Sequence, residues 1–144
     1  SAPGSTLRAR FRRPDHPIAY RYPETIMALR EGRTVYRVRR SDRGRVVLQW
    51  GPTLETDDDA AEGAQDDKEK EKDAKKEPLL VSGGVKGGSE LEGKPAILDI
   101  PVGRGRVVAF DFDPIHRYLT LSDFRLVWNA LLNWNDLPPV PATP

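Results

Sequence analysis

The chain has 144 residues, of which 38% are hydrophobic, and a formal net charge of +1 at pH 7. This length is enough for one domain with a hydrophobic core and short for two. The chain contains no cysteine, which excludes a disulfide framework, thiolate zinc sites and a cysteine nucleophile. No apolar run approaches the roughly 20 residues that cross a bilayer, so we expect no membrane span.

The charges are distributed unevenly along the chain. Residues 1–50 contain 12 arginines, no lysine and four acidic residues, which gives this part a net charge of +8. Many of these arginines alternate with apolar residues, as in residues 7–11 and 35–39, and such alternation is typical of the solvated face of an antiparallel strand. We therefore expect a solvated sheet face and no nucleic-acid partner, with an acidic protein surface as a further possibility.

Residues 55–77 contain 11 acidic residues and five lysines, with no aromatic and no large aliphatic side chain. Such a segment has no apolar surface to offset the entropy of ordering it, so we predict a disordered charged insertion. Residues 1–54 and 78–144 are then predicted to form one β-rich domain around this insertion.

Seven strands are predicted, because β-branched and apolar runs are separated by residues that favour turns. Before the insertion they cover residues 7–11, 25–29, 34–39 and 46–50, with hairpin turns at 31–33 and 42–44. After a short strand at 78–81, the runs 95–102 and 106–112 are joined through 103–105, which predicts a β-hairpin. Residues 107–110 are apolar on both faces, so we expect this strand to be central and covered on each side.

One helix is predicted over residues 122–134. Its apolar residues follow the i, i+3, i+4, i+7 spacing of a single stripe, which we expect to pack on the hairpin; they are Leu121, Phe124, Val127, Trp128 and Leu131. The predicted fold class is α+β, a small antiparallel or mixed β-sheet with a central hairpin and one C-terminal helix packed on it.

Asp111, Asp113 and His116 are the candidate site residues. Two carboxylates and an imidazole at a strand end could hold a divalent metal ion. The Asp-x-Asp spacing also resembles that of haloacid dehalogenase-type phosphatases, in which one carboxylate attacks phosphorus and magnesium neutralises charge. Only 31 residues follow Asp113, however, which leaves no room for the rest of that chemistry. We favour a turn in which Asp113 caps the backbone with its own side chain and Arg117 pairs with an aspartate.

His16 and Ser82 are two further polar residues that could carry chemistry. His16 lies in a loop bounded by prolines, without a nucleophile or metal-ligand spacing around it, and Ser82 is followed by two glycines. A catalytic serine needs a base and an orienting acid and usually sits at a sharp strand-to-helix turn, and no helical segment is predicted after the run 81–88. Turn chemistry explains the glycines after Ser82. We predict structural roles for both.

An ordered set of short motifs resembles the C-terminal region of bacterial zinc carboxypeptidase-like proteins. The order of the motifs, which span most of the chain outside the insertion, makes the resemblance more specific than any single motif. They are Pro3-Gly4-Ser5, His16-Pro17-Ile18-Ala19-Tyr20, Pro23-Glu24, Ser82-Gly83, Gly93-Lys94-Pro95-Ala96, Val102-Gly103-Arg104-Gly105-Arg106-Val107, Phe112, His116-Arg117, Phe124 and Asn129-Ala130-Leu131.

The resemblance implies a secreted or periplasmic parent protein with a catalytic zinc metallopeptidase domain, followed by a region similar to class I glutamine amidotransferases. The fragment would then belong to a larger flavodoxin-like α/β domain. The family's His-x-x-Glu zinc motif is missing from this chain, so we predict no catalytic residue and no cofactor in it, with zinc only in the parent's catalytic domain. That domain is the expected partner, and the fragment is expected to be a non-catalytic accessory domain. Asp111, where the family pattern has a small residue, and the acidic insertion depart from the resemblance.

Two other functions remain open from the residues. The chain could be a peptide- or carbohydrate-binding module, because strand edges within residues 25–50 could accept an extended peptide and aromatic side chains could stack on a glycan. The aromatic candidates are Tyr20, Tyr22, Tyr36 and Trp50. A metal-dependent phosphohydrolase at Asp111 and Asp113 is the third hypothesis.

Overall fold

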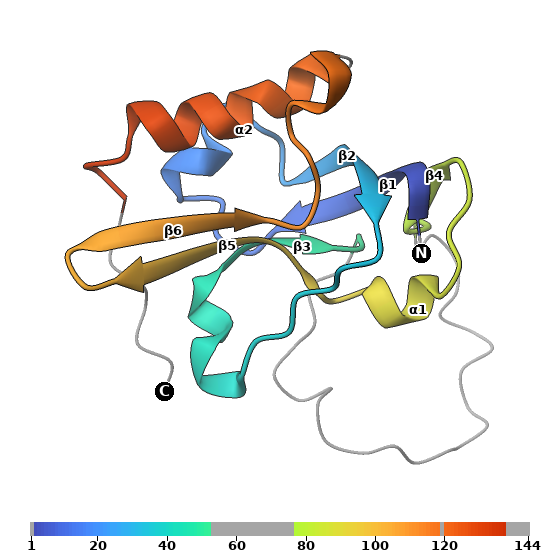
Figure 1. Ribbon diagram of the computed structural model, residues 1–144, viewed down its shortest axis with the longest axis horizontal. Helices are drawn as coiled ribbons and strands as arrows, with labels where there is room; N and C mark the ends of the chain where they lie inside the picture. Colours follow the sequence, from blue (N-terminus) through green and yellow to red (C-terminus); the bar gives the residue numbers. More distant parts are fainter. Residues whose placement is uncertain (1, 53–76, 119, 138–144) are drawn as a thin grey trace.

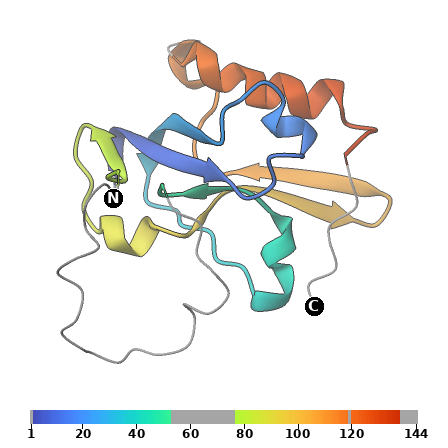
Figure 2. The ribbon, with the colours of Figure 1, turned by 180° about the vertical axis from the view of Figure 1, so that it is seen from behind.

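The computed structural model describes residues 2–52, 77–118 and 120–137. They form an α+β fold, which confirms the predicted class: a curled antiparallel sheet carries α2 on one side and η2 on the other (Figures 1 and 2). The elements are β1 (Ala2–Phe11), η1 (Pro17–Ala19), β2 (Thr25–Gly32), η2 (Arg40–Arg45), β3 (Val46–Trp50), β4 (Leu80–Ser82), α1 (Gly88–Leu91), β5 (Pro95–Val102), β6 (Gly105–Phe110), η4 (His116–Tyr118) and α2 (Leu121–Leu132).

The strands follow the order β2-β1-β3-β5-β6, and β4 pairs with β1 outside this path. Strands from both sides of the interval 53–76 therefore share one sheet. Every strand pair among the described residues is antiparallel, so this part of the chain contains none of the parallel pairs of a flavodoxin-like domain. The predicted disorder of 55–77 falls outside the described residues, except at Glu77.

The long strand β1 shows the alternation that its sequence predicts. Leu7, Ala9 and Phe11 are buried in the core, while Arg8 and Arg10 between them form ion pairs with Glu77 and Glu24 at 3.0 and 2.9 Å. One face of β1 thus carries the core and the other carries paired, partly exposed arginines, as expected for a strand with one solvated face.

Residues 34–39 form no strand, which makes that prediction wrong. The segment follows β2 and leads into η2, and η2 takes the place of the predicted turn at 42–44. Side-chain contacts hold the segment in place: Arg30 donates to the carbonyl of Thr34, and the Tyr36 hydroxyl donates to the carbonyl of Phe110. Side chains alternate along any extended backbone, whether or not it pairs with another strand. The alternation in residues 34–39 therefore does not show that a partner strand exists.

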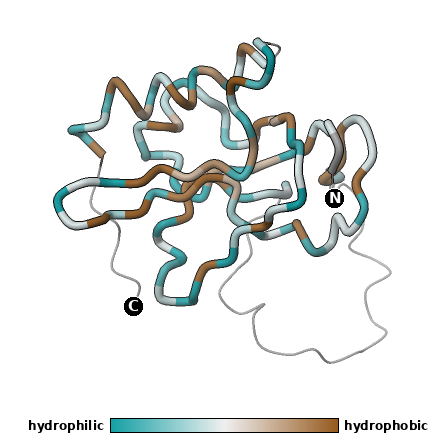
Figure 3. The backbone as a smooth tube through the Cα atoms, in the orientation of Figure 1, coloured by the Kyte–Doolittle hydropathy of each residue, from teal (hydrophilic) through white to brown (hydrophobic). Residues whose placement is uncertain are grey.

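The hairpin β5–β6 is confirmed, with Val102 opposite Gly105 and Ile97 opposite Phe110. The expectation that residues 107–110 would be central and doubly covered is wrong. Among the described strands β6 pairs with β5 alone and forms one edge of the sheet, and Val107 is 50% exposed. The hairpin stays hydrophobic over much of its length even so (Figure 3).

The helix α2 lies within one or two residues of its predicted bounds, but it buries a different face. Asp123, Leu126 and Asn129 point into the protein, whereas most of the predicted apolar stripe is exposed or half-buried. The Asn129 side-chain amide donates to the carbonyls of Ile18 and Tyr20 at 2.9 and 3.1 Å, which fixes α2 on η1. The rule that the apolar stripe faces the core failed because polar contacts with the backbone orient this helix.

No helix in the described part of the chain has the length and hydropathy that a membrane crossing requires.

Candidate functional site

Asp111 is a buried structural carboxylate. Its Oδ2 accepts hydrogen bonds from the indole Nε1 of Trp50 at 2.9 Å and from Nε of Arg30 at 3.1 Å. Burial raises the pKa of Asp111, against the opposing effect of these two donors and of the Arg30 charge. The side chain thus joins the end of the hairpin to β2 and β3, with its Oδ2 directed at these two donors.

Asp113 and His116 lie apart from this contact, near the surface. The Asp113 Oδ1 accepts from the backbone N–H of Ile115 at 3.0 Å, which is the turn contact expected from the sequence. The Nδ1 of His116 lies 3.6 Å from Glu31 and 3.8 Å from Asp113. Asp111 and Asp113 both line an open pocket of about 320 Å³, and His116 is not part of its lining. In the described residues no cluster of three potential metal-ligating side chains occurs. No ion pair between Arg117 and an aspartate occurs among them either.

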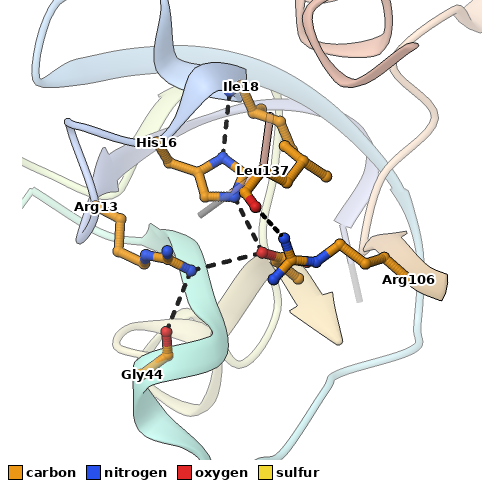
Figure 4. Close-up of polar contacts among 7 residues, drawn as sticks. Arg13, His16, Ile18, Gly44, Arg106 and Leu137 are labelled. Atoms are coloured by element: carbon orange, nitrogen blue, oxygen red, sulfur yellow. Dashed lines mark hydrogen bonds and ion pairs between the residues drawn. The ribbon is translucent and has the colours of Figure 1, made fainter. Parts of the chain in front are cut away.

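A second buried carboxylate, Asp99, gathers three basic side chains that the sequence did not link. His16 Nε2 lies 3.1 Å and Arg13 Nη1 3.6 Å from its Oδ2, and Arg106 Nε lies 3.1 Å from its Oδ1. Figure 4 shows Arg13 and His16, from the loop after β1, converging with Arg106, from β6. The sequence signal for this cluster is Asp99 itself, because a charged residue inside an apolar run needs a partner when it is buried.

The hydrogen bonds of His16 show what this Asp–His pair can do. Its Nδ1 accepts from the backbone N–H of Ile18 at 3.2 Å, so Nδ1 carries the lone pair and Nε2–H donates to Asp99. Both ring nitrogens are engaged and the ring is buried. The pair therefore ties η1 to β5, and the structural role predicted for His16 fits this geometry.

Ser82 leads into a close contact between two backbone segments. A Cβ on Gly83, whose φ is +94°, would lie 2.8 Å from Oγ of Ser5. The same Ser5 hydroxyl donates to the carbonyl of Gly84 at 2.6 Å and accepts from its N–H at 3.1 Å. The two glycines thus serve a turn that docks β4 on β1.

Three of the four aromatic residues proposed for stacking are engaged inside the protein. Trp50 is fully buried, Tyr36 donates to the carbonyl of Phe110 at 3.1 Å, and Tyr22 donates to a carbonyl in α2. Burial, together with the nearby Asp123 charge, raises the pKa of the Tyr22 hydroxyl to about 12. Tyr20 remains exposed, so these four residues form no common stacking surface.

An apolar groove lies between α2 and the hairpin, and we call it the α2 groove. It has a volume of about 610 Å³. Its apolar walls are Val108 and Phe110 from β6 and Val127, Ala130, Leu131 and Trp134 from α2 and the turn after it. Leu131 and neighbouring Trp128 are each 58% exposed and Trp134 is 72% exposed. Because exposed apolar residues gathered in one place mark interaction surfaces, the α2 groove is the candidate functional site.

Comparisons of the chain with protein-family models, with curated proteins and with solved structures gave no match.

Proposed function

We propose that the chain is a non-catalytic C-terminal accessory domain of a larger, secreted zinc carboxypeptidase-like metallopeptidase. The α2 groove is the surface through which it packs on the rest of that protein. The observation that carries this proposal is the exposed apolar face of α2 beside the half-buried side chains of β6.

The energetics favour a covered α2 groove. Burying exposed apolar area is worth roughly 25 cal/mol per Å², so a packed neighbour would stabilise Trp128, Leu131 and Trp134 relative to water. Aromatic residues are enriched in the buried cores of such interfaces. The opposite face of α2 already docks on η1, so the helix is held in place with this surface presented outward.

The non-catalytic part of the proposal is supported by how the buried polar groups are used. Asp99 and His16 bind each other and neighbouring basic groups, and Asp111 binds Arg30 and Trp50. These contacts join strands and loops of the sheet. The ordered motifs that resemble the C-terminal region of the zinc carboxypeptidase-like family supply the identity of the parent.

The first test reads the coding sequence that precedes Ser1 and assays the chain alone. We expect a His-x-x-Glu motif and a distant histidine upstream, and no peptide hydrolysis by the isolated chain with added zinc. Hydrolysis that EDTA abolishes, or an upstream region of a different enzyme class, contradicts the proposal.

The second test addresses the α2 groove in the full-length protein. Leu131→Glu places a charge on the groove, and we expect it to release the domain and accelerate limited proteolysis at the junction. Met27→Glu is the matched control, because Met27 is 54% exposed and lies on β2, outside the groove. Equal proteolysis of the two variants contradicts docking through α2.

A peptide-binding module is the second candidate, favoured by the edge position of β6. An extended peptide could pair with this edge and place its side chains in the α2 groove. Saturable amide shifts confined to β6 on titration of short apolar peptides would favour this function over docking of a parent domain.

A further inference from the structure

We propose that a basic pocket on the η2 side of the sheet binds a small tetrahedral oxyanion, either free phosphate or the phosphoryl group of a small molecule. The pocket has a volume of about 190 Å³. Its lining includes the cationic residues Arg12, Arg37, Arg43 and Lys94, with Gln49 and the backbone around Gly93 between them. We call it the basic pocket. It goes beyond the proposed function, since its lining includes η2 and that of the α2 groove includes α2, and η2 and α2 lie on opposite sides of the sheet (Figures 1 and 2).

The four cations come from separate segments that the fold brings together. Arg12 follows β1, Arg37 lies in the extended segment after β2, Arg43 belongs to η2, and Lys94 precedes β5. Of the described residues that line the pocket, none is an aspartate or a glutamate. Cationic side chains that line one concave site attract an anion, because each adds Coulombic attraction and can donate charge-assisted hydrogen bonds.

The floor of the pocket is built from fixed groups. Gln49 is 1% exposed, and its Oε1 accepts from Nη1 of Arg12 at 2.9 Å. The backbone N–H of Arg12 donates to Val47 at 2.9 Å, and the carbonyl of Lys94 accepts from Trp50 at 2.9 Å. The backbone at Arg12 and Lys94 and the guanidinium of Arg12 are thereby anchored to β3, which reduces the ordering that binding of an anion requires.

The pocket exists because β3 and β5 lose their regular pairing at this point. The register shifts between Leu48 and Gln49, and Gln49 then lies opposite Pro95, which has no N–H to donate. The segment that carries Arg37 and η2 close the remaining sides. The site therefore lies at an irregularity of the sheet, a place where strands commonly redirect side chains toward ligands.

Charge and size together select the ligand class. Guanidinium groups match the geometry of phosphate oxygens and form strong charge-assisted hydrogen bonds with them. A volume of about 190 Å³ is below the roughly 300–1,000 Å³ of pockets for drug-sized ligands. The pocket suits one oxyanion, with any attached small molecule directed into solvent.

The experiment is a titration of the full chain followed by backbone amide NMR, with inorganic phosphate in one arm and glycerol phosphate in the other. Sodium chloride at matched ionic strength is the reference. We expect saturable shifts at residues 12, 37, 43, 49 and 94 in at least one arm. Saturation by phosphate alone assigns the free ion, and saturation by glycerol phosphate as well assigns a phosphoryl group; both outcomes support the site.

Two variants make the result specific. Arg37→Gln and Lys94→Gln should each weaken binding by roughly tenfold, the loss expected for one charge-assisted hydrogen bond. Arg33→Gln is the matched control, because Arg33 is exposed and does not line the pocket. Shifts that do not saturate, that sodium chloride reproduces, or that both pocket variants leave unchanged overturn the proposal.

Discussion

Asp99 and His16 form a buried hydrogen bond of 3.1 Å across 83 positions of the sequence. Asp99 lies in the middle of β5, and His16 precedes η1, on which α2 rests. Two arginines, Arg13 and Arg106, complete the neutralisation of the Asp99 carboxylate. This cluster joins three parts of the chain through charge, beside a cluster of buried apolar side chains.

Removal of the charge at the centre of this cluster should be costly. We predict that Asp99→Asn lowers the free energy of unfolding by roughly 3–5 kcal/mol, because two arginines then lose their buried counter-charge. Urea denaturation followed by tryptophan fluorescence measures this change. Asp113→Asn is the matched control; it keeps the oxygen that accepts from Ile115, and its expected effect is within about 0.5 kcal/mol. Equal effects of the two variants would show that the Asp99 cluster contributes no more than an exposed turn.

Asp123 makes the stability depend on pH. Burial raises the pKa of this carboxyl from the ordinary value of 3.8, so the folded state holds its proton to higher pH than the unfolded state does. Stability from this group is therefore present below the unfolded pKa and is lost as pH rises through the folded pKa.

We predict that Asp123→Asn, which cannot ionise, stabilises the protein at about pH 7 and loses this advantage below about pH 4. Thermal unfolding of both proteins across this range is the measurement. The pKa of Asp111 is also raised, but Asp111 is present in both proteins. The difference between their unfolding temperatures therefore reports on Asp123. An advantage of the variant that is independent of pH would argue against ionisation as the cause.

Gly83 should tolerate no side chain. An added Cβ would lie 2.8 Å from Oγ and 3.1 Å from Cα of Ser5, at a φ of +94°. We expect Gly83→Ala to destabilise the protein by roughly 2 kcal/mol or more. Gly84→Ala is the control, since a Cβ there has no atom within 4 Å, and chemical denaturation of both variants compares them. A loss for Gly84→Ala as large as for Gly83→Ala would contradict the close contact with Ser5.

The two faces of α2 can be distinguished with one pair of truncations. Leu126 is fully buried and Leu131 is 58% exposed. Leu126→Ala should cost roughly 2–5 kcal/mol in the free energy of unfolding of the isolated chain, and Leu131→Ala should cost less than about 1 kcal/mol. A larger loss of stability for Leu131→Ala than for Leu126→Ala would show that the apolar stripe predicted from the sequence is the buried face of α2.

Much of the fold was accessible from local patterns. The hairpin, β1, β2, β3 and α2 occur at or close to their predicted positions, because strand alternation and helical spacing are local properties. The prediction of a strand at 34–39 is wrong for the same reason, since its side chains alternate as in a strand although the segment belongs to none.

The α+β class, the hairpin and the position of the last helix follow from residues that are close neighbours in the sequence. Folding sets which face of α2 is buried, makes β6 an edge strand among the described strands and brings Asp99 to His16. It also gathers the lining of the basic pocket from segments up to 83 positions apart, from Arg12 to Pro95. The physical reason is that a side chain's burial and charge balance depend on groups brought near by folding, and no local pattern records them.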